Sequence, residues 1–564
     1  MLTRGPMAGA VLFAALINLG GCQSAADDST VNDSQLASAP SQSIVKGPSH
    51  WSGKVSYTDR LYHSTALTKE ERQRPLQGVS LELLDTQLQP IATTQSDKNG
   101  HFSLTVDSHS HSSVSRIRFK ATAITEGGYQ LNLYNNGQQL YRHDHYLNDS
   151  TGDSEIELRF DDPSLAGGMN MLDVLTQAMQ FLAAHRPDKP ALPPLDIYWQ
   201  AGESRGTYFC DEYDGIDCVN GPGMYVSDSR SDSDSYDDDV LWHEFGHYIE
   251  YALGISDSPG GYHFVTDEAL DLRLSWSEGY ASYVMAAIKQ WLVAQTPEAL
   301  STTAHNRVTN YVDTRLFNGW SFDFANRDQG LCSGGDDCYL YASNEVAVSQ
   351  ILWQLDQAYG TEQLWPLIDQ ALPAAKAKGE WIHLERLWEA ALARFGEPER
   401  PTLEAIFAER WVFMQPDAFE SDNTLDATLP LNDCRDTAVN QTCLSQAHTL
   451  YGEGDIDVVR LQLADHRTYR IETFDLRNGA DTLITLYSEG GGELLEDDDN
   501  DNRNYVTSPP DQLNDGSNLR SGLTFTPNRS GLFYVSVQSS PEQATLAPFA
   551  GKYGSYRLRV SVVR

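Results

Sequence analysis

The sequence predicts a multidomain protein: an N-terminal β-sandwich, a mainly α (α+β) central domain and a C-terminal β-sandwich. The chain has 564 residues, enough for about three to four domains at ~150 residues each. Hydrophobic residues make up 40% and aromatic residues 10%, which excludes a mainly disordered chain. The spacing of apolar residues changes along the chain from strand alternation to a helical period and back, which divides it into three parts.

The net charge excludes one class of partner. Lys and Arg number 40 and Asp and Glu number 79, a formal charge of −39. Because so acidic a surface repels a phosphate backbone, we expect no nucleic-acid partner. No run of 18 or more apolar residues follows residue 21, so no membrane-spanning helix is predicted beyond the N-terminus.

Residues 1–21 have the pattern of an export signal. A basic residue precedes an apolar stretch that is too short to span a bilayer stably. The string Leu19-Gly20-Gly21-Cys22 resembles the lipobox of bacterial lipoproteins; an ordinary secretory signal with a chance cysteine is the alternative. The resemblance implies a lipidated Cys22 that anchors the protein to a membrane. Gln23 resembles the residue that directs such lipoproteins to the bacterial outer membrane.

The cysteines form local pairs. There are seven, and six remain when the lipobox cysteine is set aside. Exported bacterial proteins meet oxidising conditions, so we expect three short disulfide loops. Structural zinc is the weaker alternative, because no pair has the C-x-x-C spacing. The predicted pairs are Cys210 with Cys218, Cys332 with Cys338, and Cys434 with Cys443.

The N-terminal part consists of a tether and a strand-rich domain. Residues 22–48 are rich in Ser, Ala, Asp and Gln and predict a flexible tether. In residues 49–162 apolar side chains alternate, as in 79–83 and 102–106, with turn sequences between such runs. The strings around Gly78 and Gly100 resemble the transthyretin-like domain found beside many secreted peptidases. A β-sandwich is therefore expected here.

The remaining chain divides into three segments. Residues 163–425 show helical spacing, with amphipathic stretches at 346–355 and 381–395. Residues 426–449 predict a linker that carries a disulfide, and residues 450–564 return to strand alternation. The final segment resembles the bacterial pre-peptidase C-terminal domain in four strings, at 454–457, 469–471, 478–482 and 531–535.

An acidic run in the final segment is a candidate calcium site. Glu496 to Asp501 could bind Ca²⁺ together with Asp455, Asp457 or Asp481. A solvated acidic loop is the alternative, because the EF-hand spacing is absent.

The strongest chemical pattern is His-Glu-x-x-His at residues 243–247. On a helix, residues i and i+4 lie on one face, so His243 and His247 can point at one metal. Glu244 lies ~100° around the helix and can reach a metal-bound water without binding the ion. The alternative is a surface helix with two unrelated histidines, although Asp237 and its acidic neighbours suit a capped helix start.

A third ligand is expected about 30 residues later. The segment from Ser275 to Tyr283 looks like the second helix of gluzincins, the thermolysin and aminopeptidase relatives, and residues 234–247 resemble bacterial relatives of fungalysin. The resemblance implies a zincin-type catalytic domain with zinc held by His243, His247 and Glu278, and Glu244 as general base. Three rival third ligands remain: Glu250, His263 and Glu268.

Two departures from the gluzincin pattern concern the site. Ser282 stands where thermolysin-like enzymes place an Asp that orients a ligand. A peptide hydrolase also needs a donor to the oxyanion, for which Tyr341 is the candidate. Tyr339 is a competitor, and a buried core tyrosine is the alternative.

By this resemblance we expect an enzyme, a secreted and lipid-anchored zinc metalloendopeptidase that hydrolyses protein or peptide substrates. Two alternatives remain open. One is a non-catalytic surface binding protein or adhesin on a peptidase-like scaffold, and the other is a zinc aminopeptidase.

Overall fold

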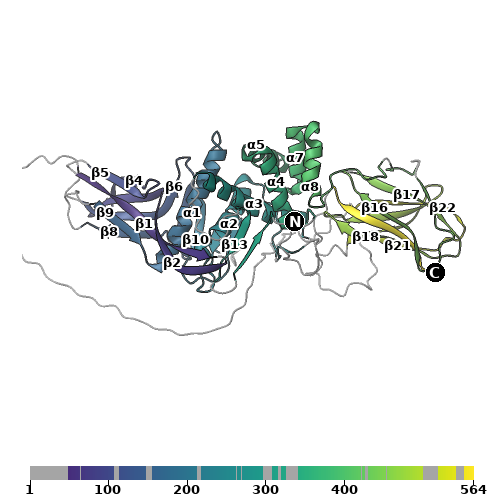
Figure 1. Ribbon diagram of the computed structural model, residues 1–564, viewed down its shortest axis with the longest axis horizontal. Coiled ribbons are helices and arrows are strands. Elements are labelled where there is room, and N and C mark those ends of the chain that lie inside the picture. Colours follow the sequence, from purple (N-terminus) through teal and green to yellow (C-terminus); the bar gives the residue numbers. More distant parts are fainter. Residues whose placement is uncertain are drawn as a thin grey trace, which may run out of the picture.

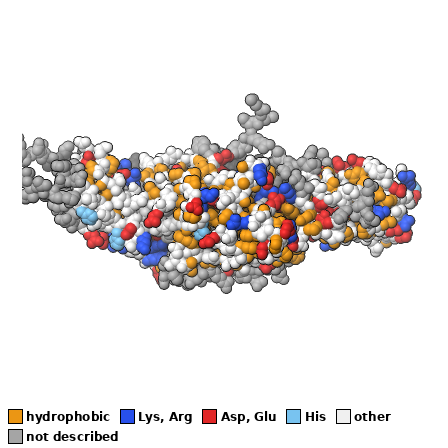
Figure 2. Space-filling model, turned by 90° about the horizontal axis from the view of Figure 1, so that it is seen from above, with side chains coloured by type: hydrophobic (Ala, Val, Ile, Leu, Met, Phe, Trp, Pro, Cys, Tyr) orange, Lys and Arg blue, Asp and Glu red, His pale blue; other side chains and the backbone are white. Residues whose placement is uncertain are grey.

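The computed structural model of the protein is an elongated row of sheets, helices and further sheets (Figure 1). It describes residues 49–564 except 64, 107–113, 148–154, 213–217, 262, 268–269, 296–307, 316–318, 326–340, 421, 426–429, 453, 499–518 and 541–551. The predicted signal, tether and lipidation site therefore lie outside the described residues, as do Cys332, Cys338, Glu268 and Tyr339. On the face in Figure 2, acidic side chains lie among basic and apolar ones.

The N-terminal region is sheet-rich, as predicted. Its described strands are β1 (Ser49–His63), β2 (Ala66–Pro75), β3 (Val79–Asp85), β4 (Pro90–Gln95), β5 (His101–Val106), β6 (Val114–Ile124), β7 (Gln130–Tyr134), β8 (Arg142–Tyr146) and β9 (Glu155–Phe160). One sheet has the order β2-β1-β5, with β9 parallel to β1. In β5 and β9 every second side chain is buried, because alternate residues of a strand point to opposite faces.

The second sheet continues past the boundary predicted after residue 162. Its order is β11-β12-β10-β7-β6-β3-β4, with β8 on β6. The three added strands are β10 (Leu195–Trp199), β11 (Tyr208–Cys210) and β12 (Gly223–Val226). β10 runs parallel to β7 and β12 parallel to β10, whereas β11 is antiparallel to β12 at the edge. The N-terminal strands thus share one sheet with β10, β11 and β12. They also share one hydrophobic core with the helices of the middle region.

Helix α1 (Pro163–His185) packs between that sheet and the remaining helices. Asp162 caps it by accepting a hydrogen bond from the Ser164 N–H, and a proline occupies its first turn. The indole N–H of Trp242, in the helix Asp238–Leu253 (α2), donates to the Val174 carbonyl of α1. A Cβ on Gly168 would lie 2.8 Å from Leu133 of β7, so this glycine lets the helix lie directly on the sheet.

Helices α2 (Asp238–Leu253), α3 (Leu272–Gln295) and α4 (Glu345–Tyr359) touch through glycines. A Cβ on Gly246 of α2 would lie 2.5 Å from the Ala281 Cα of α3. A Cβ on Gly279 would lie 2.6 Å from the Glu345 carbonyl oxygen at the start of α4. Since real side chains cannot approach so closely, these two glycines bring the three helices to the distance that the candidate site requires.

The other elements of the middle region surround this trio. They are 3₁₀ turns at Asp234–Tyr236 and Glu397–Glu399, strands β13 (Asn310–Asp313) and β14 (Trp320–Asp323), helices α5 (Thr361–Pro366), α6 (Leu372–Lys376), α7 (Leu384–Phe395) and α8 (Arg400–Ala408), and a π-helical segment at Leu367–Ala371. Helices α4 and α7 correspond to the two amphipathic stretches predicted from the sequence.

The C-terminal region forms two sheets with their own core. Its strands are β15 (Leu431–Asp433), β16 (Gln441–Thr449), β17 (Ile456–Leu463), β18 (Tyr469–Arg477), β19 (Thr482–Ser488), β20 (Glu493–Asp497), β21 (Gly522–Phe525), β22 (Gly531–Ser539) and β23 (Ser555–Val562). The sheet orders are β15-β17-β22-β19-β20 and β16-β23-β18-β21. The predicted linker 426–449 is therefore part of these sheets, because β15 and β16 pair with β17 and β23.

Two of the three predicted disulfides are present in the described residues. Cys210 is joined to Cys218, and Cys434 to Cys443. The second bridge closes the turn between β15 and β16. No helix of the described residues is both long enough and apolar enough to cross a membrane.

Candidate metal centre

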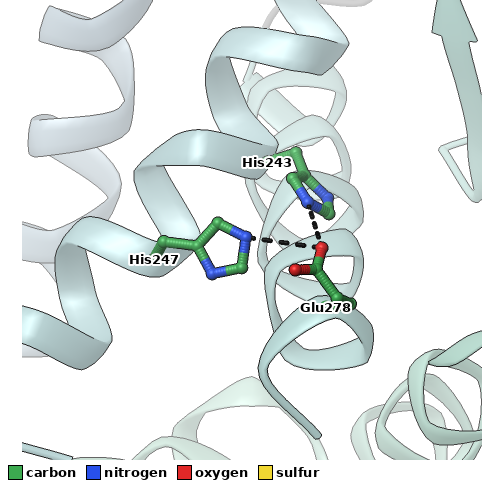
Figure 3. A group of neighbouring side chains, drawn as sticks. All are labelled: His243, His247 and Glu278. Carbon is green, nitrogen blue, oxygen red and sulfur yellow. Dashed lines mark hydrogen bonds and ion pairs between the residues drawn. The ribbon is translucent and has the colours of Figure 1, made fainter. Parts of the chain in front are cut away.

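The three predicted ligands meet where α2 lies against α3. His243 and His247 sit one turn apart on α2, and both rings point toward the Glu278 carboxylate of α3 (Figure 3). Glu278 Oε2 lies 3.2 Å from His243 Nε2 and 3.5 Å from His247 Nε2. Zinc bonds of about 2.0–2.1 Å in a tetrahedron place ligand atoms about 3.3 Å apart. The spacing and the donor types of this group fit a metal ion.

The other ring nitrogens of the two histidines also have partners. His243 Nδ1 lies 3.1 Å from Ser282 Oγ, and His247 Nδ1 lies 3.1 Å from Ser277 Oγ. Ser277 in turn donates to Glu250 Oε2 at 2.5 Å. Ser282 thus takes the orienting position where an Asp was expected by resemblance. Glu250, one of the rival ligands, lies behind His247 and acts on its ring from the outer side, as such partners do at metal sites.

The charges of this group attract a cation. Burial lowers the pKa of His247, but the Glu278 carboxylate and the bond to Glu250 outweigh it and hold that pKa well above its usual value. Burial raises the pKa of Glu278, but His263 and His247 outweigh it and hold that pKa well below its usual value. Glu278 is therefore an anion, and the centre favours positive charge beside it, either protons or a metal.

Glu244 lies beside the group without joining it. Its Oε2 accepts a hydrogen bond of 2.7 Å from the Phe209 N–H of edge strand β11. Burial raises the pKa of Glu244, while His247 and His243 oppose that shift. A carboxylate with a raised pKa that faces a metal group without ligating it is suited to accept a proton.

An open cavity of about 300 Å³ adjoins the centre. It gives the ion position access to a small ligand, as a catalytic rather than a structural site requires. Its lining residues are His243, His263, Phe264, Val265, Glu278, Ser282, Tyr311, Trp320, Phe322 and Glu345.

The helix start differs from the expected cap. Asp237 makes no capping bond through its side chain. Its carboxylate instead accepts from the Thr314 hydroxyl and from the Thr314 N–H at 2.8 Å. Since Thr314 directly follows β13, this carboxylate fixes a wall of the cavity relative to α2.

Tyr341, the predicted oxyanion donor, does not lie with the three candidate ligands and does not line the cavity beside them. Its ring packs against Trp411 at 6.2 Å, with the Arg477 guanidinium 4.4 Å above it. The chain turns at Tyr341 with a φ of 76°, and the N–H donates to the Arg410 carbonyl. This turn directs the side chain toward the C-terminal sheets, away from the cavity.

Two lining residues of the cavity were not found from the sequence. Tyr311 of β13 has its ring 5.7 Å from that of His243, and burial raises its pKa, so its hydroxyl keeps its proton. Glu345, the first residue of α4, points into the same cavity. Tyr311 falls in a short strand without a motif, and Glu345 resembles any acidic residue in a first helical turn.

A second buried group lies where the chain enters the C-terminal sheets. Asp417, His448 and Asp457 offer ligand atoms within 4.8 Å of one another. His448 Nδ1 lies 3.4 Å from a carboxylate oxygen of each aspartate. Asp422 is 1% exposed, and neither of its oxygens has a hydrogen-bond partner. Of the predicted calcium ligands, Asp457 belongs to this group, whereas Asp481 and the described part of the acidic run do not.

The comparisons with known proteins give only distant likenesses. No protein-family model matches the chain, and the search of curated proteins returned no match either. Among solved structures, the chain is similar to a pre-peptidase C-terminal domain of collagenase from Bacillus anthracis, with 15% identity, 24% of this chain, 99% of that chain and a TM-score of 0.16.

Two further structures are similar over about a quarter of this chain. One is CorA, a surface-associated copper-binding protein from Methylomicrobium album BG8, with 12% identity, 24% of this chain, 98% of that chain and a TM-score of 0.15. The other is a 9R-lipoxygenase from Cyanothece PCC8801, with 13% identity, 27% of each chain and a TM-score of 0.12. At such TM-scores the functional argument rests on the candidate site alone.

Proposed function

We propose that the chain is a zinc metallopeptidase, and specifically an endopeptidase. One observation carries the proposal: two imidazoles and one carboxylate converge beside an open cavity, with a buried Glu244 next to them. Three protein ligands with an open fourth position are the arrangement of catalytic zinc sites.

Each residue of the site would have its own role in hydrolysis. His243, His247 and Glu278 would hold a zinc ion, which when bound polarises a carbonyl group and makes water more acidic. Glu244 would take a proton at its carboxylate from the attacking water and deliver it to the leaving amine. The Tyr311 hydroxyl would donate a hydrogen bond to the developing oxyanion, in place of Tyr341.

The test of this function is Glu244→Gln with zinc measured on the same samples. Glutamine keeps the shape and cannot accept the proton, so we expect at least a ~10²-fold loss in the rate of peptide cleavage with zinc retained. Glu362→Gln, an exposed change on α5, is the control and should cleave like wild type. A zinc-loaded wild type that cleaves nothing in a broad peptide library supports the non-catalytic binding protein instead.

Substrates with a blocked amino terminus separate the two peptidase candidates. An endopeptidase cleaves acetylated peptides, because it does not need a free ammonium group at the cleavage site. An aminopeptidase cleaves only the unblocked forms. We expect cleavage of both forms at internal bonds.

We also propose that the protein is a bacterial outer-membrane lipoprotein, anchored through Cys22 with residues 23–48 as tether. The lipobox resemblance supports this, since more than one acyl chain makes a stable anchor. Cys22→Ser should then move the protein from the membrane fraction to the soluble fraction. A variant that still sediments with membranes would contradict the anchor.

For the group at Asp417, His448 and Asp457 we propose calcium. Both oxygens of Asp422 and one of Asp457 are buried without a hydrogen-bond partner, and carboxylate oxygens are the ligands that calcium prefers. Glu420 supports the assignment, because burial and Asp455 raise its pKa to about 7. Repulsion among these carboxylates would be relieved by a divalent cation.

A further inference from the structure

His263 and Glu345 form a second cluster in the same cavity. His263 Nε2 lies 3.6 Å from Glu278 Oε2 and 3.4 Å from Glu345 Oε2. The three residues offer ligand atoms within 4.8 Å of one another. Glu278 therefore belongs to two clusters, with the two histidines of α2 on one side and with His263 and Glu345 on the other.

The ring of His263 is oriented like that of a metal ligand. Its Nδ1 lies 3.0 Å from the Gly261 carbonyl oxygen. A carbonyl only accepts hydrogen bonds, so Nδ1 carries a hydrogen and Nε2 is the ring atom that faces the two carboxylates. A divalent cation bound between Nε2 and the two carboxylates would take the place of a proton on Nε2. A backbone carbonyl on the outer nitrogen is the usual orienting partner of a metal-bound histidine.

Glu345 gives a second and independent indication. The residue is 7% exposed, and its Oε2 has no hydrogen-bond partner although it faces the cavity. The His263 ring lies 3.4 Å from this oxygen, so a cation held between the two would compensate the buried carboxylate. The position is also fixed, because Glu345 starts α4, and Gly279 brings that helix against α3.

We infer that His263, Glu345 and Glu278 form a second divalent-cation site, with the Glu278 carboxylate bridging two ions. The distances of 3.4 and 3.6 Å match the spacing of about 3.3 Å between ligands of one zinc ion. Glu345 and the shared Glu278 carboxylate would supply oxygen donors to this ion, and His263 would supply a nitrogen donor. Two-metal sites with ions about 3.5–4 Å apart are known in hydrolases, where the pair clamps both reacting oxygens.

The inference deepens the proposed function, since it shares Glu278 with the centre on α2. Metal content separates the two ideas. Protein stripped with a chelator is titrated with zinc, and bound zinc per chain is measured for wild type and variants after removal of free ions. His243→Ala disables the first site only, whereas Glu345→Gln and His263→Ala disable the second only.

We expect Glu345→Gln and His263→Ala each to bind one zinc fewer per chain than wild type. Glu362→Gln and His101→Ala are exposed controls and should bind the wild-type number. Circular dichroism shows whether each variant is folded. If the second-site variants bind as much zinc as wild type, the inference is wrong while the zinc centre stands. If His243→Ala loses no zinc, the proposed function fails as well.

Cobalt tests the distance between the ions, which a count alone does not give. Two Co²⁺ ions bridged by one carboxylate couple magnetically, so the electron paramagnetic resonance signal per cobalt should fall on loading the second equivalent. Glu345→Gln should abolish this fall. A second cobalt that binds without changing the signal of the first lies elsewhere in the chain and overturns the inference.

Discussion

Two groups of histidine and acidic residues in the protein combine these residue types in different proportions. One is the centre on α2 and α3, and the other consists of Asp417, His448 and Asp457. The first has two imidazoles and one carboxylate beside a cavity of about 300 Å³. The second has one imidazole among carboxylates, with His448 2% and Asp457 0% exposed. Nitrogen donors suit zinc and oxygen donors suit calcium. Donor type and access are therefore the two properties in which the groups differ.

The connecting role of the second group is visible in its bonds. Asp417 follows α8 and accepts from the Thr449 N–H at 2.8 Å. Asp457 of β17 accepts from the Tyr556 hydroxyl of β23 at 2.5 Å. The group thus joins the last segment of the helical region to both C-terminal sheets.

The largest effect that tests this contrast is expected from Glu278→Ala. Structural zinc sites bind with about 10–16 kcal/mol over four ligands, so losing one ligand should cost about 3–4 kcal/mol, or 10²–10³-fold in zinc affinity. A competition titration against a chromophoric chelator measures it. Calcium stabilisation of the chain should be unchanged in this variant, and full zinc occupancy would remove Glu278 from the centre.

Calcium should stabilise the fold through the group of Asp417, His448 and Asp457, and not through the centre on α2 and α3. With calcium at 100 times its Kd, the folded state should gain about 2.7 kcal/mol, seen as a higher Tm of the C-terminal transition in calorimetry. Asp422→Asn should reduce that gain, whereas His243→Ala should retain it. An equal gain in wild type and Asp422→Asn would place the calcium elsewhere.

A smaller effect is expected from the outer partners of the histidines. Ser282→Ala removes the group 3.1 Å from His243 Nδ1, and such losses cost about 10–100-fold in metal affinity. The zinc titration described for Glu278 applies here too. Ser321→Ala, a serine of β14 that does not line the cavity, is the matched control. Unchanged zinc affinity in Ser282→Ala would show that this hydroxyl does not orient the ring.

The smallest effect concerns a buried carboxylate that belongs to neither group. Burial raises the pKa of Glu385 to about 7, although the N–H groups of Lys552 and Tyr553 oppose the shift. A folded pKa above the unfolded value means that stability is fully present below about pH 4.5 and is lost as the pH rises through about 7. Raising the pH from 6 to 8 should therefore lower the unfolding free energy by about 1 kcal/mol.

Glu385→Gln should remove that part of the pH dependence without changing zinc or calcium affinity. Chemical denaturation at the two pH values measures it. An identical pH dependence in the variant would mean that another buried acid titrates in this range.

The sequence predicted which side chains converge at the centre, because a helix fixes their spacing. His243 and His247 follow from the helical repeat alone, and Glu278 required a resemblance to a second helix. The place of Tyr341 away from the cavity depends on a backbone turn with positive φ, which no periodicity shows. Glu345 could not be found, since its approach to Glu278 depends on a glycine contact between two helices 66 residues apart in the chain.

The domain limits also show that local patterns can be predicted from the sequence, whereas long-range contacts cannot. Strand alternation predicted the sheets of both ends, because it is a local property. It could not show that β10 to β12 join the N-terminal sheet, since strand pairing across α1 is a long-range choice.

Because of that shared sheet, the two ends of the protein differ in how independent they are of the middle region. The C-terminal sheets have a separate core and meet the helical region at a boundary, through contacts such as those of Tyr553 and Asp417. Their exchange or loss in a gene would disturb that boundary without dividing a sheet. The N-terminal strands cannot be lost in this way, because a chain that began at residue 163 would leave β10 as an unpaired edge and bare the sheet-facing side of α1. Inheritance should therefore keep residues 49–420 together as one unit, whatever follows them.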